Sequence, residues 1–312
     1  MNNRSAILVT GGAGNVGSAL VHKLAYNTLN TVVVIDNLST GHKDKIPVLD
    51  NVIYIKADVN DHRDLMPVFG RFNFEYVFHY AAVVGVKRTL NNPMSVLHDI
   101  EGIKNILSLS KNTGVKRVFY SSSSEVYGEP FEIPQNEQTT PLNSRLPYAV
   151  VKNVGEAFFR SFYDEYGLEY TIFRFFNTYG ANQSDDFVVP RFLRAAMNNE
   201  DLFVYGDGMQ TRSFCYVDDN VDTCIKAMYS EDYINEVLNI GSDKEMTILE
   251  LAQRIIAHTG SKSKIIHLPA LKEGDMARRC PDNSKMRTLL NRDLVPLEEG
   301  LEHLIKYYEN RD

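Results

Sequence analysis

The stretch AILVTGGAGNVG, residues 6–17, decides the fold of this chain. Residues 6–9 have the composition of a short buried strand, and the residues after Gly17 continue an apolar stripe of helical period. Between them, Gly11, Gly14 and Gly17 allow a tight turn, close approach of the backbone to a pyrophosphate, and close packing of helix on strand. The stretch therefore predicts a dinucleotide site with its phosphates at the N-terminus of the helix.

The next predicted strand, residues 31–35, leads directly to Asp36. An acid at the end of the second strand accepts hydrogen bonds from the ribose hydroxyls of the adenosine and repels a 2′-phosphate. A solvated carboxylate at a strand end is the alternative. Because the glycine turn precedes it, we interpret Asp36 as a cofactor residue and predict NAD rather than NADP.

Strands and helices continue to alternate through the first half of the chain. The predicted strands are 52–55, 76–79 and 117–120, and the predicted helices between them are 61–69 and 96–113. This alternation predicts an α/β fold, a Rossmann-like, doubly wound parallel sheet with helices on both faces. Ligands of such sheets bind beyond the carboxyl ends of the strands, where Asp58, Ala81 and Ser123 lie.

Tyr148 and Lys152 are four residues apart at the start of a predicted helix that runs to about residue 166. That spacing places both side chains on one face of a helix. A phenol has an unperturbed pKa near ~10, and a neighbouring ammonium favours the phenolate and lowers that pKa. The pair could thus interconvert an alcohol and a ketone near neutral pH, although exposed Tyr–Lys pairs are also common on helices.

The composition of the 312 residues limits the function classes. The formal net charge of −7 disfavours a nucleic-acid-binding surface. The three cysteines have no metal-ligand spacing and cannot all pair, so we predict no metal site and a reduced, cytoplasmic setting. No apolar run reaches membrane-spanning length, and none at the start has the length of a signal segment.

Several further motifs follow one another in a characteristic order. They are DNLSTG at 36–41, ADV at 57–59, SSSEVYG at 122–128, YxxxK at 148–152, RFFNTYG at 174–180, YGDG at 205–208, QTR at 210–212, YVDD at 216–219 and LNIG at 238–241. With the glycine turn, this series resembles the extended short-chain dehydrogenase/reductase family, which contains nucleotide-sugar epimerases, dehydratases and decarboxylases. The resemblance covers nearly the whole chain and implies NAD as cofactor and a nucleotide-diphosphate sugar as substrate.

The resemblance also implies roles for individual residues. Tyr148 would be the acid/base at the sugar hydroxyl, Lys152 would hold the nicotinamide ribose, and Ser123 would hydrogen-bond the reacting oxygen. Glu125 is a further catalytic candidate. The candidate cofactor residues are Gly11, Gly14, Asn15, Val16, Gly17, Asp36, Asn37, Ser39, Thr40, Asp58, Val59, Ala81, Ala82, Tyr148 and Lys152. The candidate substrate residues are Ser124, Asn177, Arg191, Tyr205, Arg212 and Arg278, with Arg279 as an alternative to Arg278.

The family implies a division of the chain into two parts. Residues 1–179 would form the NAD-binding domain, with a return segment at about 236–260, and residues 180–312 a smaller lobe for the sugar nucleotide. Helices near 96–110 and 148–166 form a dimer interface in the family, so a homodimer is expected. One departure from the family pattern is Asp99, which stands where the family often has asparagine.

The pair Ser124–Glu125 bears on the net reaction. UDP-glucuronate decarboxylases and GDP-mannose dehydratases of the family carry Ser-Glu here. Decarboxylases usually have Pro-Arg where this chain has Ala181–Asn182, and the GDP-mannose dehydratases prefer NADP, which Asp36 disfavours. We therefore favour oxidation at C4 with net 4-epimerisation, or C4 dehydrogenation. The alternatives are a UDP-glucuronate decarboxylase, an NDP-sugar 4,6-dehydratase and, more remotely, a non-catalytic NAD- or nucleotide-binding protein.

Overall fold

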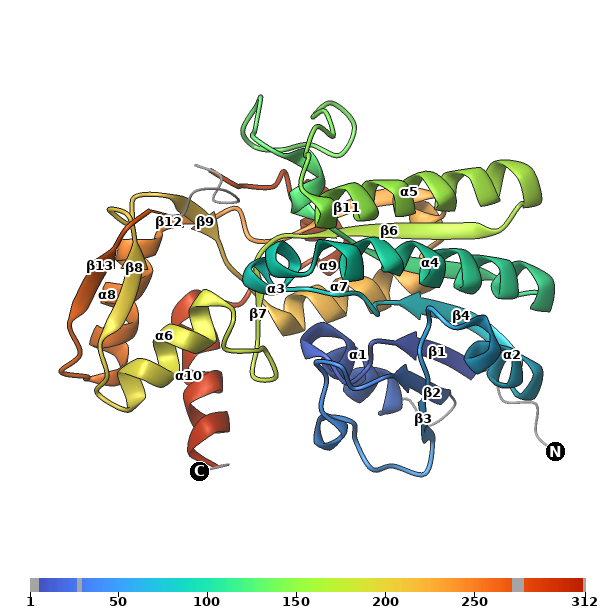
Figure 1. Ribbon diagram of the computed structural model, residues 1–312, viewed down its shortest axis with the longest axis horizontal. Coiled ribbons are helices and arrows are strands. Elements are labelled where there is room, and N and C mark those ends of the chain that lie inside the picture. The colour runs from blue at the N-terminus through green and yellow to red at the C-terminus, as the bar shows by residue number, and fades with distance from the viewer. Residues whose placement is uncertain (1–5, 27–29, 271–277, 311–312) are drawn as a thin grey trace.

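One seven-stranded sheet forms the centre of the fold (Figure 1). The structure, a computed structural model, describes residues 6–26, 30–270 and 278–310. The strands of the sheet are β1 (Ala6–Thr10), β2 (Thr31–Asp36), β3 (Val52–Lys56), β4 (Phe74–His79), β5 (Arg117–Ser123), β6 (Glu169–Phe175) and β11 (Glu236–Ile240). They are all parallel and lie in the order β11-β6-β5-β4-β1-β2-β3. The predicted doubly wound parallel sheet is confirmed, and its winding direction reverses between β1 and β4.

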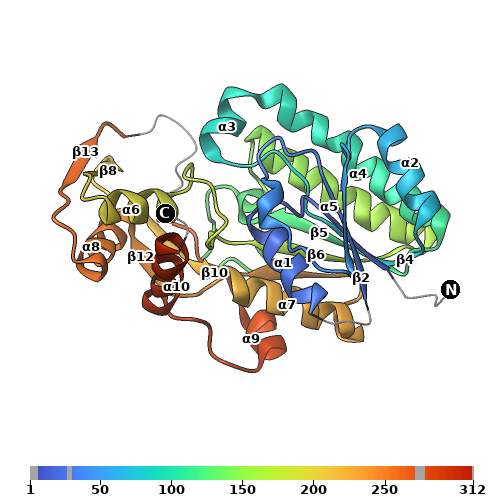
Figure 2. The same cartoon turned by 90° about the horizontal axis from the view of Figure 1, so that it is seen from below.

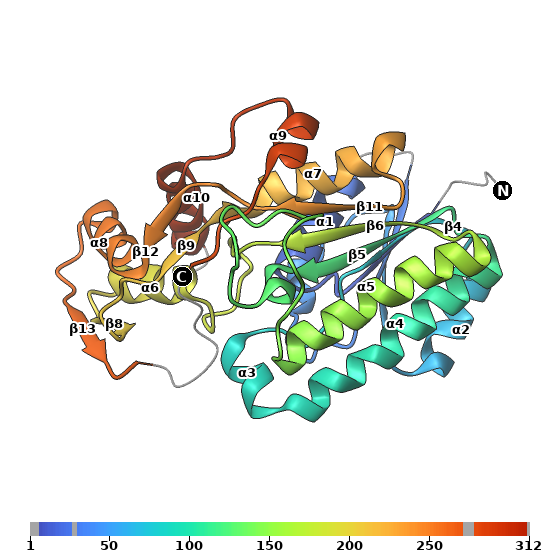
Figure 3. The same cartoon turned by 90° about the horizontal axis from the view of Figure 1, so that it is seen from above.

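Helices cover both faces of the sheet, as Figures 2 and 3 show. One face carries α1 (Asn15–Ala25) and α7 (Val217–Tyr229), which pack against each other. The other face carries α2 (His62–Arg71), α4 (Pro93–Thr113) and α5 (Pro147–Tyr166). Two short segments, α3 (Val86–Asn91) and the 3₁₀ turn η2 (Ser124–Tyr127), follow β4 and β5. A sheet covered on both faces explains why its strands read as continuous apolar runs.

Side chains of β1 alternate between the two hydrophobic cores that this arrangement creates. Ile7 and Val9 are buried with residues of α1 and α7, whereas Leu8 is buried with residues of α2, α4 and α5. The period of two along the strand distributes successive side chains to opposite faces. The sheet is thereby held on both sides, and the carboxyl ends of its strands form one firmly positioned edge.

A smaller lobe lies at one end of the molecule, beyond the carboxyl ends of the strands (Figure 1). The remaining elements after β6 are β7 (Thr178–Tyr179), α6 (Val188–Met197), β8 (Leu202–Tyr205), β9 (Thr211–Ser213), β10 (Cys215–Tyr216), β12 (Glu245–Thr247), α8 (Ile248–Thr259), β13 (Ile265–Leu268), α9 (Ser284–Leu290) and α10 (Leu297–Glu309). In the lobe, α6 packs against α8, β8 pairs with β13 in parallel, and β9 pairs with β12 antiparallel. Two more 3₁₀ turns are η1 (Lys43–Lys45) and η3 (Glu231–Tyr233).

Helix ends follow local sequence signals. α5 begins at Pro147, whose fixed φ suits a first helical position, and ends before Gly167 with φ 72°. Thr247 caps α8 by accepting a hydrogen bond from the Glu250 N–H at 3.0 Å. Within the described residues, no helix is both long and apolar enough to cross a bilayer, and no group of three potential metal ligands is found.

Candidate active site

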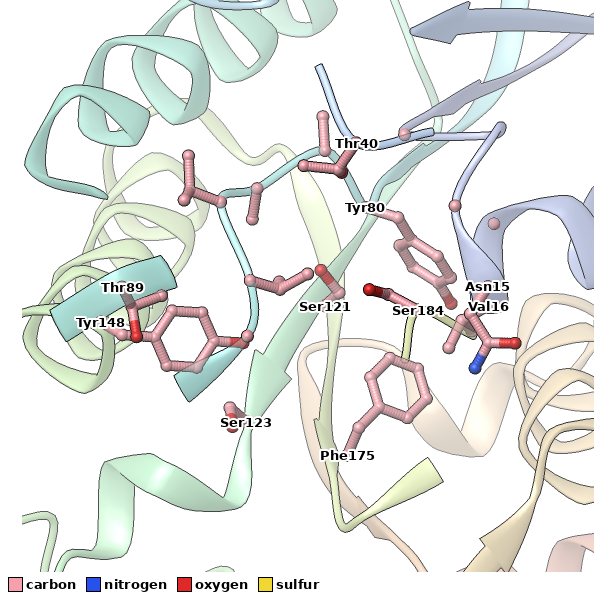
Figure 4. A pocket seen from close by; sticks show the side chains of 18 of the residues that line it. Asn15, Val16, Thr40, Tyr80, Thr89, Ser121, Ser123, Tyr148, Phe175 and Ser184 are labelled. Carbon is pink, nitrogen blue, oxygen red and sulfur yellow. The ribbon is translucent and has the colours of Figure 1, made fainter. Parts of the chain in front are cut away.

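A cavity of about 510 Å³ opens at the carboxyl ends of β1, β2, β4 and β5 (Figure 4). Twenty of the site candidates from the sequence line it, from segments far apart in the chain. They are Gly11, Gly14, Asn15, Val16, Gly17, Asp36, Asn37, Ser39, Thr40, Asp58, Val59, Ala81, Ala82, Ser123, Ser124, Glu125, Tyr148, Lys152, Asn177 and Arg279. The fold thus brings the predicted cofactor and catalytic residues to one place.

The glycine bend between β1 and α1 forms one wall of this cavity. Gly11 has φ +68°, and a Cβ atom there would lie 2.6 Å from the Ala81 backbone nitrogen. At Gly17 a Cβ atom would lie 2.2 Å from the carbonyl oxygen of Gly11. Gly14, the N-cap of α1, has no side chain to accept hydrogen bonds from the first turn. The bend is therefore compact only with glycine, and the first turn of the helix faces the cavity.

Asp36 links the end of β2 to this bend. Its two carboxylate oxygens accept hydrogen bonds from the backbone N–H groups of Ala13, at 3.0 Å, and Leu38, at 2.8 Å. Beyond it, the Asn37 amide donates to the Asp58 carboxylate at 3.1 Å. The carboxylate of Asp36 is held at the cavity wall with lone pairs remaining for ribose hydroxyls.

Tyr148 and Ser123 lie together on the opposite side of the cavity from Asn15 and Val16, as Figure 4 shows. Tyr148 comes from the first turn of α5 and Ser123 from the end of β5. The Ser123 hydroxyl is close enough to Tyr148 to lower the pKa of the phenol. The Ser123 oxygen accepts the Glu125 N–H at 3.2 Å, which fixes its orientation. A proton-transferring phenol and a hydroxyl that could contact the same substrate oxygen are thus adjacent.

Lys152 lies one helical turn after Tyr148 and is 3% exposed. Its ammonium donates to the carbonyl oxygen of Ser121 at 2.6 Å, and it sits 5.7 Å from the centre of the Tyr148 ring. Burial lowers the pKa of Lys152 from 10.5 to about 8, and the charge of Asp99 opposes that shift. The amine is therefore fixed by the strand end of β5 and still mostly protonated at neutral pH.

The pKa of Tyr148 differs from what the sequence predicts. The Tyr–Lys spacing predicts a phenol made more acidic by its neighbour, but burial raises the pKa of Tyr148 well above its usual range. The Ser123 hydroxyl and the charge of Arg279 lower it, whereas the carboxylates of Glu125 and Asp99 raise it further. Removing a phenolate from water is unfavourable, and in this enclosed cavity that effect outweighs the effects of Ser123 and Arg279.

Glu125 and Arg279 form an ion pair at the cavity wall, with Nη1 and Oε1 2.8 Å apart. Arg279 is only 5% exposed. Its segment is anchored where the Gln135 N–H donates to the Cys280 carbonyl oxygen and the Asp282 N–H donates to that of Gln135, both at 2.8 Å. The sequence named Arg279 only as the alternative to Arg278. The backbone pairing with Gln135 places the buried Arg279 side chain at the cavity wall.

The geometry can be compared with known proteins. The sequence model of the NAD dependent epimerase/dehydratase family matches residues 7–241. The chain belongs to this family. A relative from Danio rerio, UDP-glucuronic acid decarboxylase 1, is 36% identical over 98% of this chain and 73% of its own. A putative UDP-glucose 4-epimerase from Methanocaldococcus jannaschii is 34% identical over 98% and 99% of the two chains. The solved UDP-glucose 4-epimerase of Thermotoga maritima, with UDP-glucose, has a TM-score of 0.92 at 33% identity, covering 98% of this chain and 99% of that one.

As a member of the NAD dependent epimerase/dehydratase family, the chain uses NAD, and its residues fit that cofactor. The bend at Gly11 and Gly17 leaves no room for side chains and presents the first turn of α1 to the cavity, which suits a pyrophosphate. Asp36 stands at the strand end where a ribose would be held. An adenosine would then lie toward Asp58, and the nicotinamide toward Tyr148 and Lys152.

Four of the substrate residues predicted from the sequence do not line the cavity. Arg278 is exposed and pairs with Glu245 on β12, with Nη2 and Oε2 2.5 Å apart. Arg212, on β9, is 8% exposed and donates to the Thr211 carbonyl oxygen at 2.7 Å. Arg191 lies in α6, and Tyr205 ends β8. Asn177, by contrast, lines the cavity, and its amide donates to the Ser213 carbonyl oxygen at 3.1 Å.

Proposed function

We propose that this enzyme oxidises C4 of a nucleoside-diphosphate sugar and then reduces the ketone from the other face, giving net 4-epimerisation. The observation that carries the proposal is that Tyr148, Ser123 and Lys152 share one cavity with the glycine bend. The M. jannaschii and T. maritima relatives, named as UDP-glucose 4-epimerases, support a UDP-sugar as substrate. Residues 1–179 bind NAD in this proposal, and residues 180–312 bind most of the sugar nucleotide.

The chemistry requires a base for the C4 hydroxyl proton and a group that steadies the C4 oxygen. NAD, when bound, supplies the hydride acceptor and a positive charge. Burial favours the neutral phenol, so Tyr148 acts as a base only in its phenolate form, which the positive charges of bound NAD and of Lys152 favour. The phenolate accepts the hydroxyl proton as the C4–H bond breaks, and Ser123 donates a hydrogen bond to the C4 oxygen. After the sugar has turned, Tyr148 returns the proton to that oxygen, so the enzyme regains its starting state. Lys152, held by Ser121, keeps a positive charge beside the phenol.

Exchange of Tyr148 for phenylalanine tests the assignment. With a panel of UDP-, GDP- and dTDP-sugars, Tyr148→Phe should lower turnover by roughly 10²–10⁴-fold, because proton transfer is lost. NAD affinity, measured by calorimetry, should change little. Tyr166→Phe, on the exposed end of the same helix, is the matched control. Full turnover by Tyr148→Phe would reject the proposed role.

The ion pair of Glu125 and Arg279 favours a second candidate, decarboxylation of a nucleotide-linked uronate. The sequence departs from the decarboxylase pattern at Ala181–Asn182, but Arg279 provides a cation at the cavity wall. Oxidation at C4 of a uronate gives a β-keto acid. Its C5–C6 bond then breaks, carbon dioxide leaves, a proton is added at C5, and hydride returns to C4. The Danio rerio relative, named as a UDP-glucuronic acid decarboxylase, supports this alternative.

Product analysis separates the two candidates. Epimerisation predicts interconversion of two neutral UDP-sugars with no gas released, whereas decarboxylation predicts carbon dioxide from UDP-glucuronate. In the second case Arg279→Gln should abolish gas release, while Arg278→Gln, its exposed neighbour, should not. A chromophoric 4-keto-6-deoxy product would instead establish 4,6-dehydration and reject both.

The enzyme acts as a homodimer in this proposal, through the outer faces of α4 and α5. These adjacent helices expose Met94, Leu97, Val150 and Tyr163, which are 75%, 38%, 37% and 41% exposed. Its three cysteines are free and buried, which supports a cytoplasmic location, and the net charge of −7 supports a partner other than nucleic acid. Light scattering after size-exclusion chromatography measures the assembly, and a monomer at micromolar concentration would reject the dimer.

A further inference from the structure

Asp99 is an acidic residue inside the cavity that the proposed reaction does not use. It lies on α4, is 8% exposed, and lines the cavity with Tyr148 and Lys152 of α5. A carboxylate that is removed from water is normally compensated by charge or by hydrogen bonds. The contacts of Asp99 therefore indicate which neighbouring group its charge stabilises.

A hydrogen bond fixes the Asp99 carboxylate just after β4. Its Oδ2 atom accepts the Val83 N–H at 2.7 Å, and the Asn60 side chain lies close enough to lower the pKa of the carboxyl. Asn60 is itself tied to α4, because its side-chain oxygen accepts the Gly102 N–H at 3.0 Å. The carboxylate thus has a defined position between the strand ends and the helix that carries Lys152.

The Lys152 ammonium, which lines the same cavity, acts on the charge of Asp99. Burial raises the pKa of Asp99, while the Val83 hydrogen bond and the charge of Lys152 lower it. Asp99 in turn opposes the loss of the Lys152 proton, which burial favours. The other titratable groups that act on this pair or respond to it are Asp58 after β3, His79 of β4, Tyr120 of β5, and Tyr148. Of these, Asp58 has the same sign as Asp99, and His79 and Tyr120 are neutral at pH 7.

We propose that Asp99 is a positioning residue whose negative charge holds Lys152 as an ammonium in the enclosed cavity and sets the pH range of the Tyr148–Lys152 pair. This inference rests on the proposed function for its kinetic consequence. The charge acts on both members of the pair in the same direction, since an anion favours the protonated amine and the protonated phenol. Losing it should move both titrations to lower pH.

The Asp99→Asn variant tests this charge while keeping the Val83 hydrogen bond, because an amide oxygen accepts the same N–H. Both limbs of the pH profile of kcat/KM should move to lower pH by about one unit, the usual size of the effect of a neighbouring charge in an enclosed site. Asp99→Ser also removes the charge and should shift the profile in the same direction. Glu101→Gln, an exposed carboxylate two residues along the same helix, is the control and should leave the profile unchanged.

A second measurement separates this inference from the proposed reaction. Phenolate absorbance of the NAD-loaded protein is titrated with and without Asp99→Asn, and the Tyr148→Phe titration is subtracted to isolate Tyr148. A shift to lower pH in Asp99→Asn supports the inference even if no nucleotide sugar is turned over, in which case only the proposed function fails. Unshifted titrations in both charge-removing variants would overturn the inference, whatever their turnover.

Discussion

Replacing Gly17 by alanine should disable cofactor binding through a single methyl group. The Cβ atom would lie 2.2 Å from the Gly11 carbonyl oxygen and 2.9 Å from both the Gly11 carbonyl carbon and the Gly12 Cα. Ordinary contact begins at 3.4 Å, so the helix must move away from the bend by about 1.2 Å. All three atoms belong to the backbone, and the bend cannot recede because Gly11 already lies against the backbone of Ala81.

The size of the effect follows from the hydrogen bonds that this movement would stretch. A displacement of about 1 Å lengthens an amide–phosphate hydrogen bond from ~2.9 Å to nearly 4 Å, where it no longer counts as one. Hydrogen bonds to charged groups contribute roughly 1.5–3 kcal/mol each. Loss of two of them from the first turn of α1 would weaken NAD binding by about 3–6 kcal/mol, or ~10²–10⁴-fold.

The assay is a titration of NADH fluorescence, with thermal unfolding measured on the same samples to show that the variant is folded. Gly70→Ala, in α2, is the matched control because its added Cβ would meet nothing within 4 Å. It should bind NADH like the unmodified chain and be more stable by roughly 0.5–1 kcal/mol. A folded Gly17→Ala protein with unchanged affinity would refute the argument that the bend must contain glycine here.

Three further substitutions test other parts of the site and its support. Asp36→Ser should reduce the preference for NAD over NADP by about tenfold or more, because the carboxylate that repels a 2′-phosphate is gone. The dissociation constants of NAD and NADP measure this preference, and an unchanged ratio would reject the proposed role of Asp36. Glu156→Gln would leave the buried Arg174 guanidinium without its bidentate partner and should lower the free energy of unfolding in urea by about 3–5 kcal/mol; a loss below 1 kcal/mol would contradict this. Burial, with a smaller effect from Lys152, lowers the pKa of His79 from 6.5 to about 3. Protonation of His79 therefore favours the unfolded chain. The free energy of unfolding should fall as the pH decreases from 6.5 toward 3, by up to ~1.4 kcal/mol per pH unit. His79→Gln should flatten that decline between pH 7 and pH 5, and equal slopes would count against it.

Much of the fold was predictable because its signals are local. The glycine bend, the apolar strands and the caps of α5 and α8 each depend on residues within one turn or one strand. The parallel sheet then follows from the alternation of strands and helices. The edge where ligands bind follows from the same topology, which is why cofactor and catalytic candidates meet in one cavity.

Properties that depend on distant parts of the chain were less accessible. Arg278 and Arg279 are neighbouring residues of the same type, so the sequence does not distinguish their roles. In the structure, the backbone pairing with Gln135 places Arg279 against Glu125, while Arg278 pairs with Glu245. The sequence predicts the wrong direction for the pKa of Tyr148 for a similar reason. Helical spacing reveals the neighbouring amine, but only the folded chain reveals how completely the phenol is removed from water.

The ion pair between Glu125 and Arg279 has a consequence for how the protein is made. The two residues are 154 positions apart, and a ribosome delivers them in that order. When Arg279 is synthesised, the glycine bend and the first strands have long left the exit tunnel, and domains generally fold from the N-terminus during synthesis. The nascent chain should therefore gain its affinity for the dinucleotide well before this wall of the cavity exists. A stalled-ribosome series that captures NAD at intermediate lengths would reveal that order of maturation.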